Sequence, residues 1–78
     1  MPRYFMHIRD GRAKTPDEEG FEAGNLHQAQ VEARRLIRTL IVRQMEEGRG
    51  PGGQFVELRD EKGHIQDVIT FKDVLRQV

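Results

Sequence analysis

The chain has 78 residues, which is enough for a single domain, residues 1–78, with a small hydrophobic core. It contains no cysteine, which excludes disulfide bonds and cysteine-based metal sites or nucleophiles. Thirteen basic and thirteen acidic side chains balance, so no net charge draws the chain to nucleic acid or to an anionic membrane. Apolar runs such as residues 40–42 are far too short to span a bilayer, and the N-terminus has no apolar secretory segment. We therefore expect a cytoplasmic protein without a membrane partner.

Residues 3–9 alternate as a β-strand does, so one face is expected to carry Tyr4, Met6 and Ile8 and the other Phe5, His7 and Arg9. Because both faces include aromatic side chains, the strand is expected to be central or to have its second face covered by another chain. Asp10 and Gly11 indicate a turn. Residues 12–15 are then expected to return as a short strand that Pro16 ends.

An acidic bend, residues 17–20, follows and leads into an extended Phe21–Glu22 segment, with Phe21 expected to pack under the first turn of a helix. Paired carboxylates such as those of the bend can act as general acid and base in catalysis or can bind a hard cation. Catalytic carboxylates need contrasting environments, whereas these consecutive side chains share one solvent-exposed bend. We therefore expect no catalytic or cation site here.

One long amphipathic helix is predicted from Asn25 to Glu47. Asn25 is a favourable N-cap and Gln28 lies three residues later, as in a capping box, while Gly48 supplies a left-handed stop. The residues expected to face the core recur with helical spacing: Leu26, Ala29, Ala33, Leu36, Ile37, Leu40 and Ile41.

This helix is too long for the strands that flank it. About 22 residues span about 33 Å at 1.5 Å per residue, whereas a seven-residue strand covers about 23 Å. The last turn, residues 44–47, is therefore expected to extend past the sheet and to leave Met45 uncovered.

A second hairpin is predicted from residues 54–59 and 64–71, joined by Asp60–Gly63 with Gly63 in a left-handed position. Ile65 has an odd number and Val68 an even number, so on a regular strand their side chains would point to opposite faces. This indicates a bulge or a strand buried on both faces. Residues 71–78 are expected to close the chain with a helical turn.

Residues 5–10 (FMHIRD) resemble residues 55–60 (FVELRD), which suggests two related hairpins flanking the helix. The predicted fold is α+β, a ββαββ arrangement with an antiparallel sheet of about four strands and one long helix on one face.

The opening residues 2–11 (PRYFMHIRDG), with residues 16–20 (PDEEG) after them, resemble a family of small uncharacterised bacterial proteins, numerous in alphaproteobacteria and known as a domain of unknown function. The resemblance covers nearly the whole chain, because the family also has the central helix and an Arg-Asp-x-x-Gly hairpin like residues 59–63. It implies a fold but no activity. A fainter resemblance, of residues 17–20 followed by Asn25, is to antitoxins of the HicB type.

No constellation of residues indicates catalysis, a metal or a cofactor. His7, His27 and His64 lack the spacing of metal ligands and are expected to lie apart. Serine is absent, and no threonine has a histidine beside it. The glycines of residues 48–53 follow a helix and precede a strand, the reverse of the order in a phosphate-binding loop. We therefore predict no catalytic, metal or cofactor-binding residues and no enzyme activity.

The back of the helix carries the candidate partner-binding residues. They recur every three or four positions opposite the core residues and mix apolar with cationic side chains, a composition favoured in protein interfaces: Val31, Arg35, Arg38, Val42 and Met45. We predict a homodimer, or another protein partner, through this stripe or through the second face of the first strand. The alternative is an antitoxin-like or regulatory nucleic-acid-binding protein that uses Arg34, Arg35, Arg38 and Arg43, although the zero net charge disfavours it.

Overall fold

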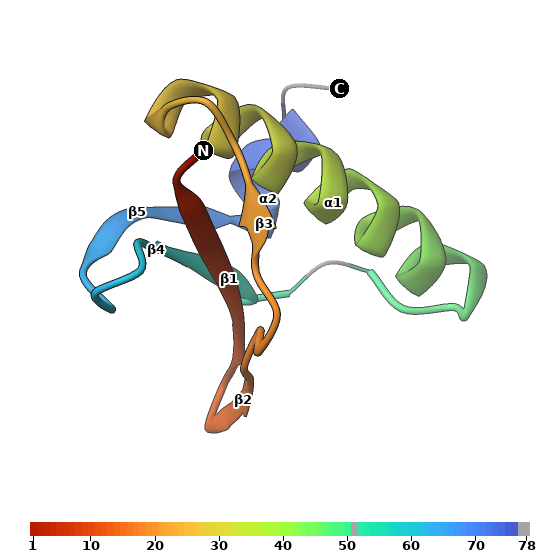
Figure 1. Cartoon of the computed structure of the whole chain (residues 1–78). Helices are drawn as coiled ribbons and strands as arrows, with labels where there is room; N and C mark the ends of the chain where they lie inside the picture. The colour runs from red at the N-terminus through yellow and green to blue at the C-terminus, as the bar shows by residue number, and fades with distance from the viewer. Residues whose placement is uncertain (51, 77–78) are drawn as a thin grey trace.

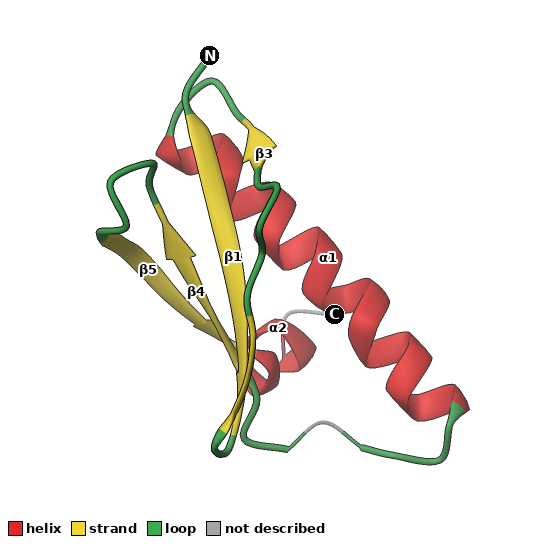
Figure 2. Cartoon of the chain, turned by 60° about the horizontal axis from the view of Figure 1, so that its bottom comes forward, coloured by secondary structure: helices red, strands yellow, loops and turns green. Residues whose placement is uncertain are grey.

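The computed structural model describes residues 1–50 and 52–76. Its elements in chain order are β1 (Arg3–Asp10), β2 (Ala13–Thr15), β3 (Phe21–Glu22), α1 (Leu26–Glu46), β4 (Phe55–Arg59), β5 (Ile65–Thr70) and α2 (Phe71–Arg76). The strands form one layer, and α1 and α2 lie together on one side of it (Figures 1 and 2). The predicted α+β class is confirmed, and β3 adds a fifth, very short strand to the four expected ones.

The sheet has the order β2-β1-β4-β5 with antiparallel neighbours, and β3 also pairs with β1. The central pairing joins β1 to β4, so that His7 lies opposite Glu57. The two segments that resemble each other in sequence are therefore neighbours that run in opposite directions. The predicted bulge is present where β5 shifts its register against Leu58 and Arg59.

Helix α1 begins and ends where its local sequence predicts. The Asn25 side chain accepts a hydrogen bond from the backbone N–H of Gln28 at 2.9 Å, and the Gln28 side chain accepts one from the N–H of Gly24 at 2.8 Å. At the other end Gly48 has φ 80°, and the N–H of Arg49 donates to the carbonyl of Gln44 at 2.8 Å. This Schellman arrangement satisfies carbonyl groups that the end of the helix leaves free.

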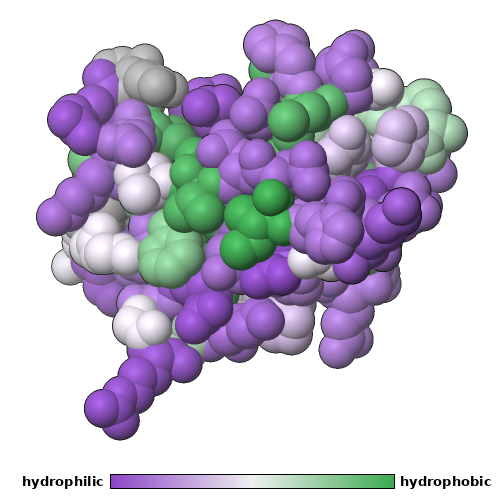
Figure 3. All heavy atoms as spheres, turned by 90° about the vertical axis from the view of Figure 1, so that its left-hand side faces the viewer, coloured by the Kyte–Doolittle hydropathy of each residue, from purple (hydrophilic) through white to green (hydrophobic). Residues whose placement is uncertain are grey.

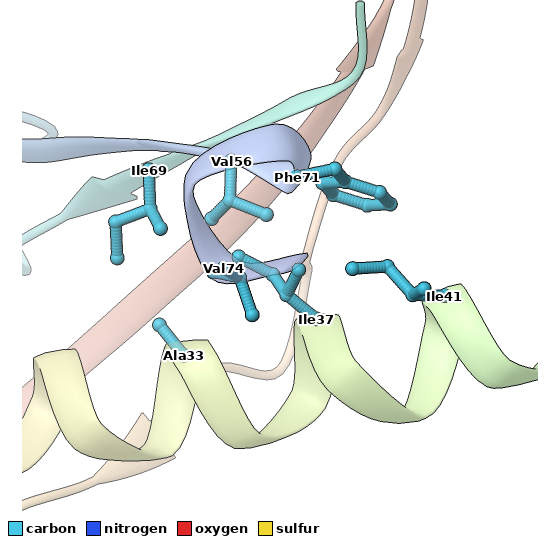
Figure 4. Packing of buried hydrophobic residues seen from close by; sticks show 7 residues of the cluster. All are labelled: Ala33, Ile37, Ile41, Val56, Ile69, Phe71 and Val74. Carbon is cyan, nitrogen blue, oxygen red and sulfur yellow. The ribbon is translucent and has the colours of Figure 1, made fainter. Parts of the chain in front are cut away.

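The main core forms between α1, α2 and the helix side of the sheet. Helix α1 contributes buried residues at every fourth position, and their side chains meet those of α2, β4 and β5 (Figure 4). The cluster consists of Ala33, Ile37, Ile41, Val56, Ile69, Phe71 and Val74. Phe71, expected to end the last strand, instead begins α2, where the Thr70 hydroxyl accepts a hydrogen bond from the N–H of Asp73 at 3.1 Å. Val78 lies outside the described residues.

The core face of α1 is narrower than its sequence suggests. Leu36 was expected in the core but is 37% exposed. The helix contacts the sheet along the row that includes Ala29 and Ala33, whose small side chains allow a close approach, and Leu36 lies to one side of this row. There it borders a shallow hollow with Met6 and Phe21 rather than entering the core.

A smaller core cluster lies under the first turns of α1. Tyr4, Ala23, Ala29 and Leu58 are buried there, with Phe21 and Leu26 packed against them. The rings of Tyr4 and Phe21 lie 6.2 Å apart between centroids. The predicted packing of Phe21 beneath the start of the helix is confirmed, and it ties β3 to both β1 and α1.

Candidate functional site

The stripe on the back of α1 is exposed along its whole length. Val31, Val42 and Met45 are 48%, 55% and 57% exposed, and Arg35 and Arg38 are exposed beside them. The C-terminal turns of α1 extend beyond the strands (Figure 2), as the difference in length predicted.

Helix α2 extends the C-terminal half of this stripe into a groove. Arg38, Ile41, Val42 and Met45 of α1 line it together with Leu75 of α2, and its volume is about 260 Å³. Leu75 is 39% exposed. We call this surface the α1–α2 groove. The sequence indicated its α1 side but not Leu75, because the packing of α2 against α1 joins residues far apart in the chain.

The four arginines of the nucleic-acid alternative do not form one patch. Arg34 is half-buried, whereas Arg35, Arg38 and Arg43 are exposed. Arg34 and Arg43 are nine residues apart on a continuous helix and therefore point in opposite directions. Arg35 also lies 3.5 Å from the carboxylate of Glu32. The helix thus disperses this positive charge.

A second surface is the sheet face opposite the helices. On β1 and β4 the residues of even number face the core, so the residues of odd number face away from it. We call this the open face; it carries Phe5, His7, Arg9, Lys14, Phe55, Glu57, Arg59 and Val68. Viewed from the side of the β4–β5 hairpin, apolar side chains form an area surrounded by hydrophilic ones (Figure 3). In that hairpin Ile65 and Val68 are 49% and 50% exposed.

Glu57 lies at the centre of the open face and is only 8% exposed. Its carboxylate lies 3.1 Å from the Arg59 guanidinium and 3.5 Å from that of Arg9. Burial raises the pKa of Glu57, but the Arg59 hydrogen bond and the charges of Arg59, Arg9 and Lys14 outweigh burial and lower the pKa below its ordinary value. Glu57 is therefore a fixed negative charge that holds two arginines in place.

Each of these arginines keeps a free donor. Arg59 also donates from Nη1 to the carbonyl of Gly63 at 2.7 Å, which fixes its position. The Nε atoms of Arg9 and Arg59 are buried and have no hydrogen-bond partner within the described residues. The Arg9 and Arg59 side chains are nevertheless 33% and 26% exposed. Each arginine is thus accessible through the exposed part of its side chain and not through its buried Nε donor.

The acidic bend supports the edge of β1. The Asp17 carboxylate accepts hydrogen bonds from the N–H groups of Met6 at 3.1 Å and Gly20 at 3.0 Å, while the N–H of Asp17 donates to Nδ1 of His7 at 3.1 Å. Burial lowers the pKa of His7, and the charges of Lys14 and Arg59 lower it further, against Asp17 and Glu57. The hydrogen bonds of Asp17 and His7 thus hold the acidic bend against the edge of β1.

The three histidines lie apart, on β1, in the first turn of α1 and beyond the Asp60–Gly63 loop. Within residues 1–50 and 52–76, no three side chains of the ligating types come close enough together to hold a metal ion. In the same part of the chain neither helix combines the length and the apolar character needed to cross a membrane.

The comparison with protein families shows to which family the chain belongs. The model of a domain of unknown function, DUF6894, matches residues 3–72. The chain belongs to this family. The match runs from β1 into α2, so it includes the open face and the α1 side of the α1–α2 groove of this DUF6894 domain. No curated protein and no solved structure matches the chain.

Proposed function

We propose that this DUF6894 domain is a non-catalytic interaction module that forms a homodimer through the α1–α2 groove. The observation that carries the proposal is the exposure of apolar side chains around an apolar hollow: Val42, Met45 and Leu75 are 55%, 57% and 39% exposed. Contiguous apolar surface on a small domain is typical of a binding site. Domains of this size without disulfides or metals often gain stability by association.

The charge pattern beside the groove favours a second copy as the partner. Arg38 precedes Val42 by four residues and Glu46 follows it by four, so all three lie on one row of α1. Neither Arg38 nor Glu46 forms an ion pair with another described residue. Two α1 helices that pack antiparallel about Val42 bring Arg38 of each copy beside Glu46 of the other. The row is thus self-complementary, as a two-fold interface requires.

The oligomeric state tests this proposal. Sedimentation velocity at micromolar concentration is expected to show a monomer–dimer equilibrium. Val42→Asp places a charge in the groove and is expected to shift the equilibrium to monomer. Val31→Asp is the matched control, because Val31 is 48% exposed on the same stripe but does not line the groove. A chain that stays monomeric at all concentrations, or a dimer that tolerates Val42→Asp, contradicts the proposal.

Charge reversal tests the antiparallel arrangement. Arg38→Glu and Glu46→Arg each bring like charges together and are expected to weaken the dimer several-fold. The double variant restores opposite charges and is expected to recover most of the affinity. Thermal unfolding of the three variants at low concentration serves as a control, because exposed side chains of this kind contribute little to the monomer's stability. Failure of the double variant to recover association rules out this pairing.

A further inference from the structure

The balanced charge of the whole chain hides an uneven distribution. The strands of the open face carry three permanent cations and one carboxylate, Arg9, Lys14 and Arg59 against Glu57, and Asp17 adds a second carboxylate at the edge of the face beside His7. Lys14 lies directly across from Arg9 at the β1–β2 pairing, and Arg59 lies on β4 on the other side of Glu57, so each of three strands contributes one cation. This face therefore keeps a small positive excess although the thirteen basic and thirteen acidic residues of the chain cancel.

The two central strands of the sheet add an aromatic ring each to this positive face. Phe5 of β1 lies opposite Arg59 of β4, and Phe55 of β4 lies opposite Arg9 of β1. Both rings are half-buried and therefore keep some exposed surface. The face thus has two phenylalanine–arginine pairs, arranged symmetrically about His7 and Glu57. Four residues separate the pairs, which is about 14 Å along a strand.

The chemistry of these pairs selects the ligand class. Phenylalanine rings stack on planar groups, and guanidinium and ammonium groups bind phosphates. A second copy is disfavoured, because face-to-face packing opposes two positive surfaces. An acidic peptide satisfies the cations but offers no regularly spaced planar rings. A single strand of nucleic acid offers both, and a few nucleotides cover the distance between the pairs.

We propose that the open face binds single-stranded nucleic acid, with Phe5 and Phe55 stacking on bases and Arg9, Lys14 and Arg59 contacting phosphates. The buried Glu57 prepares this site by holding both guanidiniums before a ligand arrives, at 3.1 Å and 3.5 Å. The side chains of Arg9 and Arg59 remain 33% and 26% exposed, which leaves surface on both for a phosphate. The surface is separate from the α1–α2 groove, so the proposal does not depend on the homodimer.

Fluorescence anisotropy with a labelled twelve-nucleotide oligo-dT and the matching oligo-rU tests the proposal on the full chain. Binding in the micromolar range is expected in about 50 mM salt. For three phosphate contacts, raising the salt to about 200 mM is expected to weaken binding roughly 20-fold. A duplex of the same length is expected to bind more weakly than the single strand, because its bases are not free to stack on the phenylalanines. Absence of binding at about 50 mM salt overturns the proposal.

Two substitutions with a matched control locate the site. Phe55→Ala is expected to weaken binding roughly tenfold through the loss of one stacking contact. Lys14→Ala is expected to weaken binding several-fold and to reduce the salt dependence by the equivalent of one contact. Arg35→Ala on the back of α1 removes the same charge and is expected to leave binding unchanged. If Phe55→Ala fails to fold by circular dichroism, the comparison of Lys14→Ala with Arg35→Ala decides, and equal losses overturn the proposal.

Two further measurements, competition binding and oligomeric state, distinguish nucleic acid from the two other possible ligands of the open face, an acidic polypeptide and a second copy of the chain. Polyglutamate at the same concentration of negative charge is expected to displace the oligonucleotide poorly. Efficient displacement assigns the face to acidic polypeptides and overturns the proposal. A change in oligomeric state caused by Lys14→Ala in the absence of oligonucleotide assigns the face to a second copy and overturns it as well. Val42→Asp, which tests the homodimer, is expected to leave oligonucleotide binding intact, so the two proposals fail independently.

Discussion

The Nδ1 atom of His7 accepts a hydrogen bond from the backbone N–H of Asp17 at 3.1 Å, which joins the acidic bend to the edge of β1. An imidazole accepts at Nδ1 only when that nitrogen carries no proton. The neutral ring is favoured further because burial lowers the pKa of His7, and the positive charges of Lys14 and Arg59 lower it again. The fold is therefore matched to the neutral form of His7.

This relationship predicts a loss of stability in mild acid. The unfolded chain binds a proton at His7 near its ordinary pKa of about 6.5, whereas the folded chain binds it only at lower pH. Because the unfolded state then holds more protons, the free energy of unfolding is expected to fall as the pH drops below about 6.5. Urea denaturation at a series of pH values measures this. His7→Asn keeps an acceptor near Asp17 but does not titrate, so it is expected to flatten this part of the profile; an unchanged profile contradicts the assignment to His7.

Gly20 is expected to tolerate no side chain. It has φ 70°, and a Cβ atom there would lie 2.6 Å from the carbonyl oxygen of Tyr4 and 2.8 Å from the ring of Phe5. Gly20→Ala therefore combines backbone strain with a steric clash and is expected to cost more than about 2 kcal/mol. Gly48→Ala is the matched control, because Gly48 has φ 80° but open space around it, and its cost is expected to be roughly 1 kcal/mol. Chemical denaturation compares the two, and equal costs would show that the contact with β1 is unimportant.

Glu57 is expected to stabilise the sheet through its charge. Glu57→Gln preserves the shape of the side chain but leaves Arg9 and Arg59 close together without their shared carboxylate. Because Glu57 is buried and the arginines are partly exposed, the expected cost is about 1–3 kcal/mol. Glu32→Gln, in the exposed pair with Arg35, is expected to cost less than about 0.5 kcal/mol. Two equal and small effects in urea denaturation would mean that solvent screens the Glu57 cluster as fully as a surface pair.

The local elements could be predicted because their signals lie within a few residues of one another. Asn25 and Gly48 mark the ends of α1 through contacts with their own neighbours, and Gly63 takes the left-handed conformation expected of the Asp60–Gly63 turn. The pairing of β1 with β4 was different, because it joins residues about fifty positions apart. No local signal fixes such a pairing, so the strand order had to come from the structure.

The candidate surfaces were predictable only in part, for the same reason. Alternation along β1 placed Phe5, His7 and Arg9 on a second face, but only the β1–β4 register brings Glu57 and Arg59 beside them. Helical periodicity identified Val42 and Met45 on the back of α1. Their companion Leu75 depended on how α2 packs, which the order of residues along one helix does not determine.

The difference between Leu36 and Ile37 gives the last prediction. Periodicity placed both in the core, yet Ile37 is fully buried and Leu36 is 37% exposed. Ile37→Ala leaves a cavity between α1, α2 and β4 and is expected to cost about 2–5 kcal/mol, enough to unfold much of a small domain. Leu36→Ala removes contacts with Met6 and Phe21 at an open hollow, where solvent fills the space, so about 1 kcal/mol is expected. Urea denaturation of both variants measures the difference. A cost for Leu36→Ala as large as that for Ile37→Ala would mean that the core stripe is as wide as the sequence indicated and that another surface covers Leu36.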